Sequence, residues 1–202
     1  MTWVGIDVGG RRKGFHLCAV SEDLTVELAH VQHPSHASEM ATQWVGNRDP
    51  WCVAIDNPAA WAPPTERSRP CEREFARAGI CGIRYTPSAE AAGMRTDTHY
   101  EWIEHGLELW AELRARGVEV IECFPTASWT QWCGAREGSR AAWTRRGLAR
   151  LMPSPPGARN QDERDSVAAA LTARQAERRP KSVVRFEALV VPAAGTSPVE
   201  NP

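Results

Sequence analysis

Residues 1–20 read MTWVGIDVGGRRKGFHLCAV. An apolar run ends on one aspartate, Asp7, and a Gly-Gly turn with a basic patch then leads into a second apolar run. Two β-type runs joined by a short turn favour an antiparallel pair of strands. Burying a carboxylate costs free energy unless a partner offsets its charge. Asp7 ends a run that otherwise favours burial, so it is a candidate functional residue.

The same pattern recurs along the chain. TVELAHV (25–31) predicts a third strand, residues 38–45 a helix, and WCVAIDNP (51–58) a fourth strand that ends again on an aspartate, Asp56. The spacing of apolar residues in 98–117 predicts an amphipathic helix, and VEVIECFP (118–125) a fifth strand with Glu122 near its end. An Ala-rich helix is predicted over 160–177 and a last strand over 182–191.

This order predicts an α/β protein with a mixed sheet, in which an antiparallel meander of three strands is joined by parallel strands and flanked by helices. We expect a single domain over residues 1–192, with an insertion at about 58–98 that follows the fourth strand. Residues 193–202 contain Pro and Ser and are expected to form a flexible tail.

Composition limits the class of protein. The chain has 202 residues, of which 42% are hydrophobic and 24% charged, and it shows neither a membrane-length apolar run nor a signal pattern. We therefore expect a cytoplasmic protein without a membrane partner. The six cysteines form no C-x-x-C pair, so structural zinc and disulfides are not expected. The net charge of −1 predicts no general affinity for polyanions. Nearly all cationic residues are arginines, however, and a guanidinium binds phosphate through two parallel hydrogen bonds.

Five acids recur at comparable places in the predicted elements. Three stand at strand ends and two in the first turns of the Ala-rich helix: Asp7, Asp56, Glu122, Asp162 and Asp165. Strand ends gather at one edge of an α/β sheet, so these acids form one cluster if the first strand lies beside the fourth. Two carboxylates 4 Å apart repel by about 4 kcal/mol at an effective dielectric constant near 20. Mg²⁺ or Mn²⁺ would compensate the repulsion, and two such ions can hydrolyse a phosphodiester. Taken singly, each aspartate could instead form a turn or cap a helix.

Basic residues supply candidates for substrate binding. Arg69, Arg73 and Arg77 recur every four residues and would form one cationic stripe on a helix, suited to phosphate or simply solvated. In 134–151 several arginines surround Trp143, which could hold a nucleic-acid backbone or belong to a helix that packs its Trp inward. The segment HVQHPSH (30–36) has histidines at steps of three, but Pro34 is expected to interrupt any helix there.

Several of these motifs resemble those of a known superfamily. GIDVGGRRKGFHLCAV resembles the first motif of the RNase H-like superfamily, in the form found in Holliday-junction resolvases, and DERDSVAAALTA resembles the terminal motif of those enzymes. Together with AIDNPAAW, RSRPCEREFARAGI and ECFPTASWT, they are similar to domain of unknown function 429, a family of predicted nucleases with an RNase H fold. The resemblance covers roughly residues 3–176.

The resemblance implies a role for each acid. Asp7 would bridge two Mg²⁺ or Mn²⁺ ions, Asp56 would be a second ligand, and Asp165 the ligand on the helix. Asp162 would assist, and Glu122 matches an acid on the fifth strand of the family. Ser166 replaces the usual alanine after the helical aspartate, a mild departure.

The expected activity is therefore metal-dependent phosphodiester hydrolysis, carried out by a nuclease that acts on DNA or RNA. One alternative is an ATP-binding protein of the actin and sugar-kinase group, whose first lobe opens with a similar G-I-D-x-G-G motif. Those proteins need two lobes, for which 202 residues leave little room. The other alternative is a non-catalytic binding module that keeps the fold and its acids.

Overall fold

A computed structural model describes residues 1–46, 53–95, 97–152 and 154–199. Its strands are β1 Thr2–Val8, β2 Phe15–Ser21, β3 Val26–Val31, β4 Val53–Asp56, β5 Val120–Cys123, β6 Val183–Phe186 and β7 Leu189–Pro192. Its helices are α1 Pro34–Val45, α2 Pro70–Ala78, α3 Ala89–Gly93, α4 Glu101–Ala115, α5 Pro125–Cys133, α6 Arg140–Leu151 and α7 Gln161–Arg178, and a 3₁₀ turn spans Pro180–Ser182. Residues 51 and 52 of the expected fourth strand lie outside the described residues.

The strands form one sheet of seven strands in the order β3-β2-β1-β4-β5-β7-β6. The first three strands make an antiparallel meander, and β1, β4, β5 and β7 run parallel to one another. This is the mixed α/β sheet, meander plus parallel strands flanked by helices, that the RNase H-like resemblance implies. The prediction of the fold class is confirmed, including the position of β1 beside β4.

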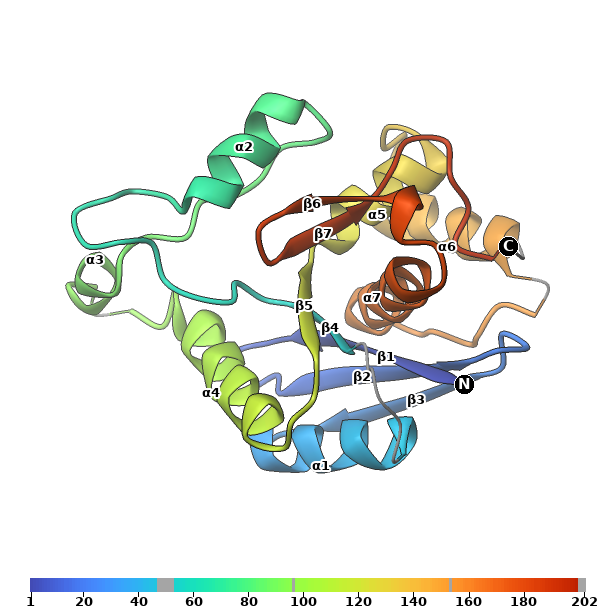
Figure 1. The fold of residues 1–202 in the computed structure, drawn as a ribbon, viewed down its shortest axis with the longest axis horizontal. Coiled ribbons are helices and arrows are strands. Elements are labelled where there is room, and N and C mark those ends of the chain that lie inside the picture. Colours follow the sequence, from blue (N-terminus) through green and yellow to red (C-terminus); the bar gives the residue numbers. More distant parts are fainter. Residues whose placement is uncertain (47–52, 96, 153, 200–202) are drawn as a thin grey trace.

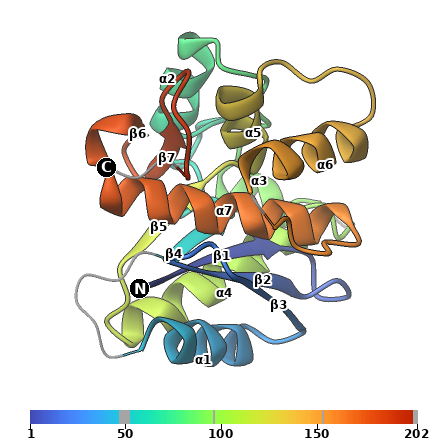
Figure 2. The ribbon, with the colours of Figure 1, turned by 90° about the vertical axis from the view of Figure 1, so that its right-hand side faces the viewer.

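Helices cover both faces of the sheet (Figures 1 and 2). Alternate strand residues such as Val4 and Ile6 face α1 and α4, where they pack with Leu109 and Leu113. The intervening residues face α7, which lies across β1 and its neighbours (Figure 2). Gly5 lets α7 approach closely, because a Cβ there would lie only 2.0 Å from the backbone nitrogen of Ala170. The backbone of helix α7 is therefore packed directly against β1 at Gly5.

Two local predictions are wrong, and one of two alternatives is confirmed. Residues 182–191 form an antiparallel hairpin of β6 and β7 instead of one strand, and Glu187 at the turn has a positive φ of 53°. Pro34 begins α1 rather than interrupting a helix, since its fixed φ and missing N–H suit the first helical turn. The arginine-rich segment forms α6, in which Trp143 is buried against α7, so the helix that packs its Trp inward is confirmed.

The segment between β4 and α4 carries α2 and α3, and α2 packs against the β6–β7 hairpin (Figure 1). At the other end of the chain, the amide of Gln175 donates to the hydroxyl of Thr196 at 2.8 Å, and Arg174 donates to the carbonyl of Pro198. Residues 193–199 thus touch α7, while the division of the chain into a domain over 1–192 and a flexible tail stays a prediction. Among the described residues no helix combines the length and the apolar character needed to cross a membrane.

Candidate metal centre

Three polar side chains stand in one row at the carboxyl ends of β1 and β4 and on the neighbouring strand β2. Asp7 on β1 is paired in register with Asp56 on β4 and with His16 on β2. Residues directly opposite each other on neighbouring strands project from the same face of a sheet. That face is the one under α7, because Gly5, two residues before Asp7, contacts α7 directly.

Helix α7 brings Asp165 to the same place. Only 3% of Asp165 is exposed, and its carboxylate accepts three hydrogen bonds. The donors are the indole of Trp129 at 3.3 Å, the amide of Gln161 at 2.9 Å and the guanidinium of Arg140 at 2.8 Å. These contacts fix the orientation of the carboxylate before any ligand binds.

Asp162 lies one turn earlier on α7 and faces the meander. Its carboxylate forms an ion pair of 2.9 Å with the ammonium group of Lys13 from the β1–β2 turn. One ligand atom each from Asp7, His16 and Asp162 lie within 4.8 Å of one another. The imidazole of His16 also packs against that of His30, with ring centroids 4.6 Å apart. The sequence patterns predict the aspartates as site residues, but none of them singles out His16.

The carboxylates destabilise one another's charged forms. Burial, followed by the charges of Asp56 and Asp165, raises the pKa of Asp7 well above its usual range. Burial, followed by the charge of Asp165, does the same to the pKa of Asp56. Burial also raises the pKa of Asp165, although the charge of Arg140 opposes this. For His16 burial lowers the pKa, which favours the neutral imidazole.

The donor set fits a divalent cation. Four carboxylates from two strands and one helix converge, and carboxylate oxygen is the ligand that Mg²⁺ and Mn²⁺ prefer. Burial is the main cause of the raised pKa values of Asp7 and Asp56, and the negative charges of the neighbouring carboxylates add to it. In this chain, Asp7, Asp56, Asp162 and Asp165 are therefore the residues that could hold such ions.

Glu122 is not part of this cluster. It is paired in register with Ile55, the residue before Asp56, so it projects from the opposite face of the sheet. There it forms a bidentate ion pair with Arg69, at 2.6 and 2.5 Å, and accepts a hydrogen bond from the backbone of Ala59 at 2.9 Å. Arg69 is held in turn by Glu72 at 3.0 Å, and all three charged side chains are buried. The contacts of Glu122 are those of a structural ion pair.

The three arginines of the expected stripe have different surroundings. Arg69 precedes α2 and is buried with Glu122, whereas Arg73 pairs with Glu66 at 2.5 Å. Arg77 is exposed near the end of α2. Binding of substrate by these residues stays a prediction, which the contacts of Arg69 and Arg73 do not favour.

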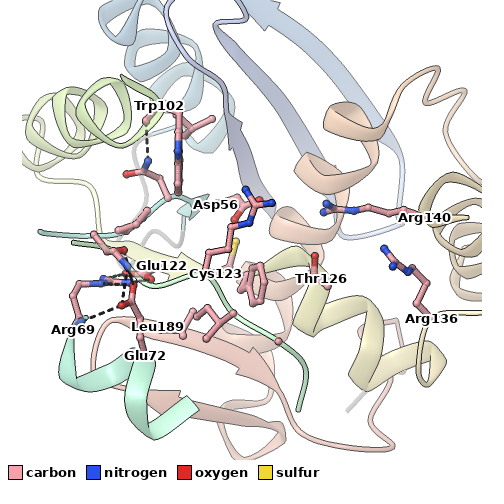
Figure 3. Close-up of a pocket in the computed structure, with 18 residues that line it drawn as sticks. Asp56, Arg69, Glu72, Trp102, Glu122, Cys123, Thr126, Arg136, Arg140 and Leu189 are labelled. Carbon is pink, nitrogen blue, oxygen red and sulfur yellow. Dashed lines mark hydrogen bonds and ion pairs between the residues drawn. The ribbon is translucent and has the colours of Figure 1, made fainter. Parts of the chain in front are cut away.

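A cavity of about 620 Å³ opens beside Asp56 (Figure 3). Arg69, Glu72 and Glu122 form one wall, Asp56 and Cys123 lie in the middle, and Arg136 and Arg140 reach in from the other side. Burial raises the pKa of the Cys123 thiol well above its usual value, so it is an uncharged wall group. The cavity therefore joins the aspartate cluster to two arginines that come from α6 and the loop before it.

Comparison with known proteins gives a family and two structures. No curated protein matches the chain. Among solved structures, it is similar to the RuvC structure of Thermus thermophilus, at 15% identity and a TM-score of 0.46 over 84% of this chain and 91% of that one. It is also similar to T. thermophilus RuvC in complex with Holliday junction substrate, at 15% identity and a TM-score of 0.44 over 84% and 90% of the two chains. A family model described as "Protein of unknown function (DUF429)" matches residues 5–186, a range that contains the whole aspartate cluster.

Proposed function

The chain belongs to the DUF429 family, and we propose that it is a metal-dependent phosphodiesterase, a nuclease that acts on DNA or RNA. The observation that carries the proposal is the convergence of Asp7, Asp56 and Asp165 from three distant parts of the sequence on one face of the sheet. Such a concentration of buried carboxylates is unfavourable by itself, so it indicates a site made for cations.

In the proposed centre, Asp7 stands between two groups of ligands. Asp56 and Asp165 lie on one side of it, and Asp162 lies with the β1–β2 hairpin on the other. Asp7 is therefore the residue suited to bridge two Mg²⁺ or Mn²⁺ ions. When bound, such ions activate water for attack on phosphorus and stabilise the charge of the leaving oxygen. In the proposal Glu122 keeps the adjoining wall in place and binds no ion.

The arginines of the cavity are suited to hold the substrate phosphate. Arg140 uses one Nη atom on Asp165, and its buried Nε has no partner among the described residues. Arg136 is exposed and lines the same wall. A guanidinium next to a metal-binding carboxylate can also donate to a phosphate oxygen without leaving the site, because it offers five N–H donors. The proposal thus places the phosphate between the aspartates and α6.

The ATP-binding alternative requires a glycine-rich turn with free backbone amides, and the turn after Asp7 does not favour it. The amide of Gly9 donates to Gly14 O at 2.8 Å, and that of Arg11 donates to the Glu101 carboxylate at 3.0 Å. The carboxylate of Glu101 also lies against this turn, since a Cβ on Gly10 would be 2.6 Å from Glu101 Oε2, and its charge would repel a phosphate. The non-catalytic alternative is decided by the assay below.

The test is hydrolysis of a panel of nucleic acids in Mn²⁺ or Mg²⁺. The panel contains single-stranded DNA, duplex DNA, a four-way DNA junction and RNA, the junction being included because of the motif resemblance. We expect cleavage of at least one substrate that requires the divalent ion. Asp7→Asn should reduce the rate by about 10³-fold, because the metal contribution is several kcal/mol.

Asp23→Asn is the matched control, since Asp23 is an exposed aspartate in the β2–β3 turn and bonds only to Ser21 and Thr25 among the described residues. It should keep the full rate. A wild-type protein that binds these ions through Asp7 and cleaves nothing would support the binding module, and cleavage that persists in Asp7→Asn would overturn the proposed centre.

A further inference from the structure

The proposed centre has two sides with different chemistry. On the side of Asp56 and Asp165 every candidate ligand atom is a carboxylate oxygen. On the side of the β1–β2 hairpin, the imidazole of His16 stands with the carboxylates of Asp7 and Asp162, and one ligand atom of each lies within 4.8 Å of the others. Atoms at such separations can bind one ion after small rotations of the side chains.

The fold fixes His16 in this position. It is paired in register with Asp7 on an antiparallel strand, so the two side chains emerge side by side from the face under α7. Its ring is packed against His30, whose Nε2 lies 2.6 Å from the carbonyl oxygen of Lys13. His30 and the turn thus hold the imidazole at the edge of the carboxylate cluster.

A positively charged side chain, that of Lys13, already lies on this side of the centre. The ammonium group of Lys13 lies 2.9 Å from Asp162, although the Lys13 side chain is 65% exposed. A flexible and solvated side chain can leave when a stronger cation binds. The ion pair shows that this corner of the cluster attracts positive charge.

We infer that Asp7, His16 and Asp162 form a mixed nitrogen–oxygen metal site that selects Mn²⁺ and other first-row transition ions over Mg²⁺. Imidazole is a good ligand for transition ions, whereas Mg²⁺ prefers oxygen ligands and water. The inference rests on the proposed function in one respect only, the use of Asp7 as a metal ligand, and it can be tested without any substrate.

The first measurement is pulsed EPR on the wild-type protein with one equivalent of Mn²⁺. We expect nitrogen coupling from a coordinated imidazole. His16→Asn replaces the ring nitrogen by an amide and should abolish that coupling. His36→Asn is the matched control, because His36 is exposed on α1, which covers the opposite face of the sheet from α7. It should keep the coupling.

The second measurement is calorimetric titration with each ion. We expect Mn²⁺ to bind the wild type about tenfold or more tightly than Mg²⁺ at this site, and His16→Asn to lower the Mn²⁺ affinity by about tenfold while the Mg²⁺ affinity changes little. Circular dichroism checks that the variant is folded.

The outcomes separate this inference from the proposed function. Wild-type protein that binds Mn²⁺ without nitrogen coupling, or His16→Asn that keeps the preference for Mn²⁺, would overturn the His16 site even if nucleic acid is cleaved. Nitrogen coupling in a protein that cleaves nothing would support the site and count against the nuclease. Because the wild-type spectrum alone can refute the inference, the test does not depend on the folding of a variant.

Discussion

Two neighbouring parallel strands, β4 and β5, both carry an acid near their carboxyl ends, and the two acids have opposite surroundings. Asp56 on β4 faces α7 among other carboxylates, and burial with their charges raises its pKa well above the usual range. Glu122 on β5 faces the other way and is held by Arg69 through two short hydrogen bonds. The difference is one position of register: Glu122 pairs with Ile55, the residue before Asp56.

The comparison teaches that an acid at a strand end is not by itself a metal ligand. Side chains alternate between the faces of a sheet, so a shift of one residue moves a carboxylate from one environment to the other. Asp56 is destabilised by its neighbours unless a cation binds, whereas Glu122 is already compensated. Replacing each acid by its amide should therefore have opposite effects on stability.

Asp56→Asn gives the largest expected effect. It removes a proposed metal ligand, so the rate of metal-dependent cleavage should fall by about 10³-fold, equivalent to about 4 kcal/mol of barrier. The metal-free variant should nevertheless be more stable than the wild type at neutral pH, because a buried charge and its repulsions are gone. The rate is measured in the cleavage assay and the stability by urea unfolding with a chelator. If Asp56→Asn lowers both the cleavage rate and the free energy of unfolding, Asp56 is a structural residue.

Glu122→Gln should act in the other direction. It leaves Arg69 buried with only Glu72 as a charged partner, and losing one member of a buried ion pair costs about 3 kcal/mol or more of unfolding free energy. The Mn²⁺ affinity should stay within about twofold of wild type, since Glu122 lies on the opposite face from the cluster. Urea unfolding and calorimetric titration check the two statements. A tenfold loss of Mn²⁺ affinity with normal stability would restore Glu122 to the metal centre.

Much of this arrangement could be predicted from the sequence, and the position of Glu122 marks where the prediction stops. The apolar runs, the glycine turn and the Ala-rich helix predict the meander, β4, β5 and α7. The meeting of Asp7 with Asp56 and Asp165 follows only if β1 lies beside β4, as the structure has it. The register of β1, β4 and β5 can also be read from the sequence. Counted from the valines that pair, VGID, VAID and VIEC place Asp7, Asp56 and Cys123 at the same step, with Glu122 one step earlier.

His16 is a second site residue whose position the sequence patterns did not predict. Its pairing with Asp7 depends on the length of the β1–β2 turn, which fixes which residues stand opposite each other. The histidines of HVQHPSH were more conspicuous, yet only His30 of that segment approaches the centre, through its ring contact with His16. The bonding partners of the arginines could not be predicted either, because Arg69 and Glu122 are 53 positions apart in the sequence.

Gly5→Ala tests how the α7 face is held together. The new Cβ would lie 2.0 Å from Ala170 N and 2.2 Å from Ser166 O, so α7 must move away from β1. Overpacking of this kind costs about 2 kcal/mol. Because Asp165 is on α7, the Mn²⁺ affinity should fall as well, unlike in Glu122→Gln. Gly93→Ala is the control, since nothing lies within 4 Å of its Cβ and it should leave both properties unchanged. Unchanged metal binding in a destabilised Gly5→Ala would place the ligands elsewhere than under α7.

The dependence of stability on pH compares the two kinds of acid in one titration. Asp7, Asp56 and Asp165 have raised pKa values in the folded protein, so the folded state binds more protons than the unfolded state above about pH 4. The unfolding free energy of metal-free protein should therefore fall as pH rises from about 4, by about 1.4 kcal/mol for each unit of pKa difference.

The exposed Asp97 acts below that window, because a hydrogen bond and ion pair with Arg95 lower its pKa to about 2, so its contribution to stability is lost only in stronger acid. Urea unfolding between pH 4 and 8 should show the decline in wild type and a flatter profile in Asp7→Asn, which lacks one of the repelling charges. Added Mn²⁺ should reverse the slope, since binding displaces protons from the same carboxylates. Identical profiles for wild type and Asp7→Asn would mean that the carboxylates under α7 do not share one charge cluster.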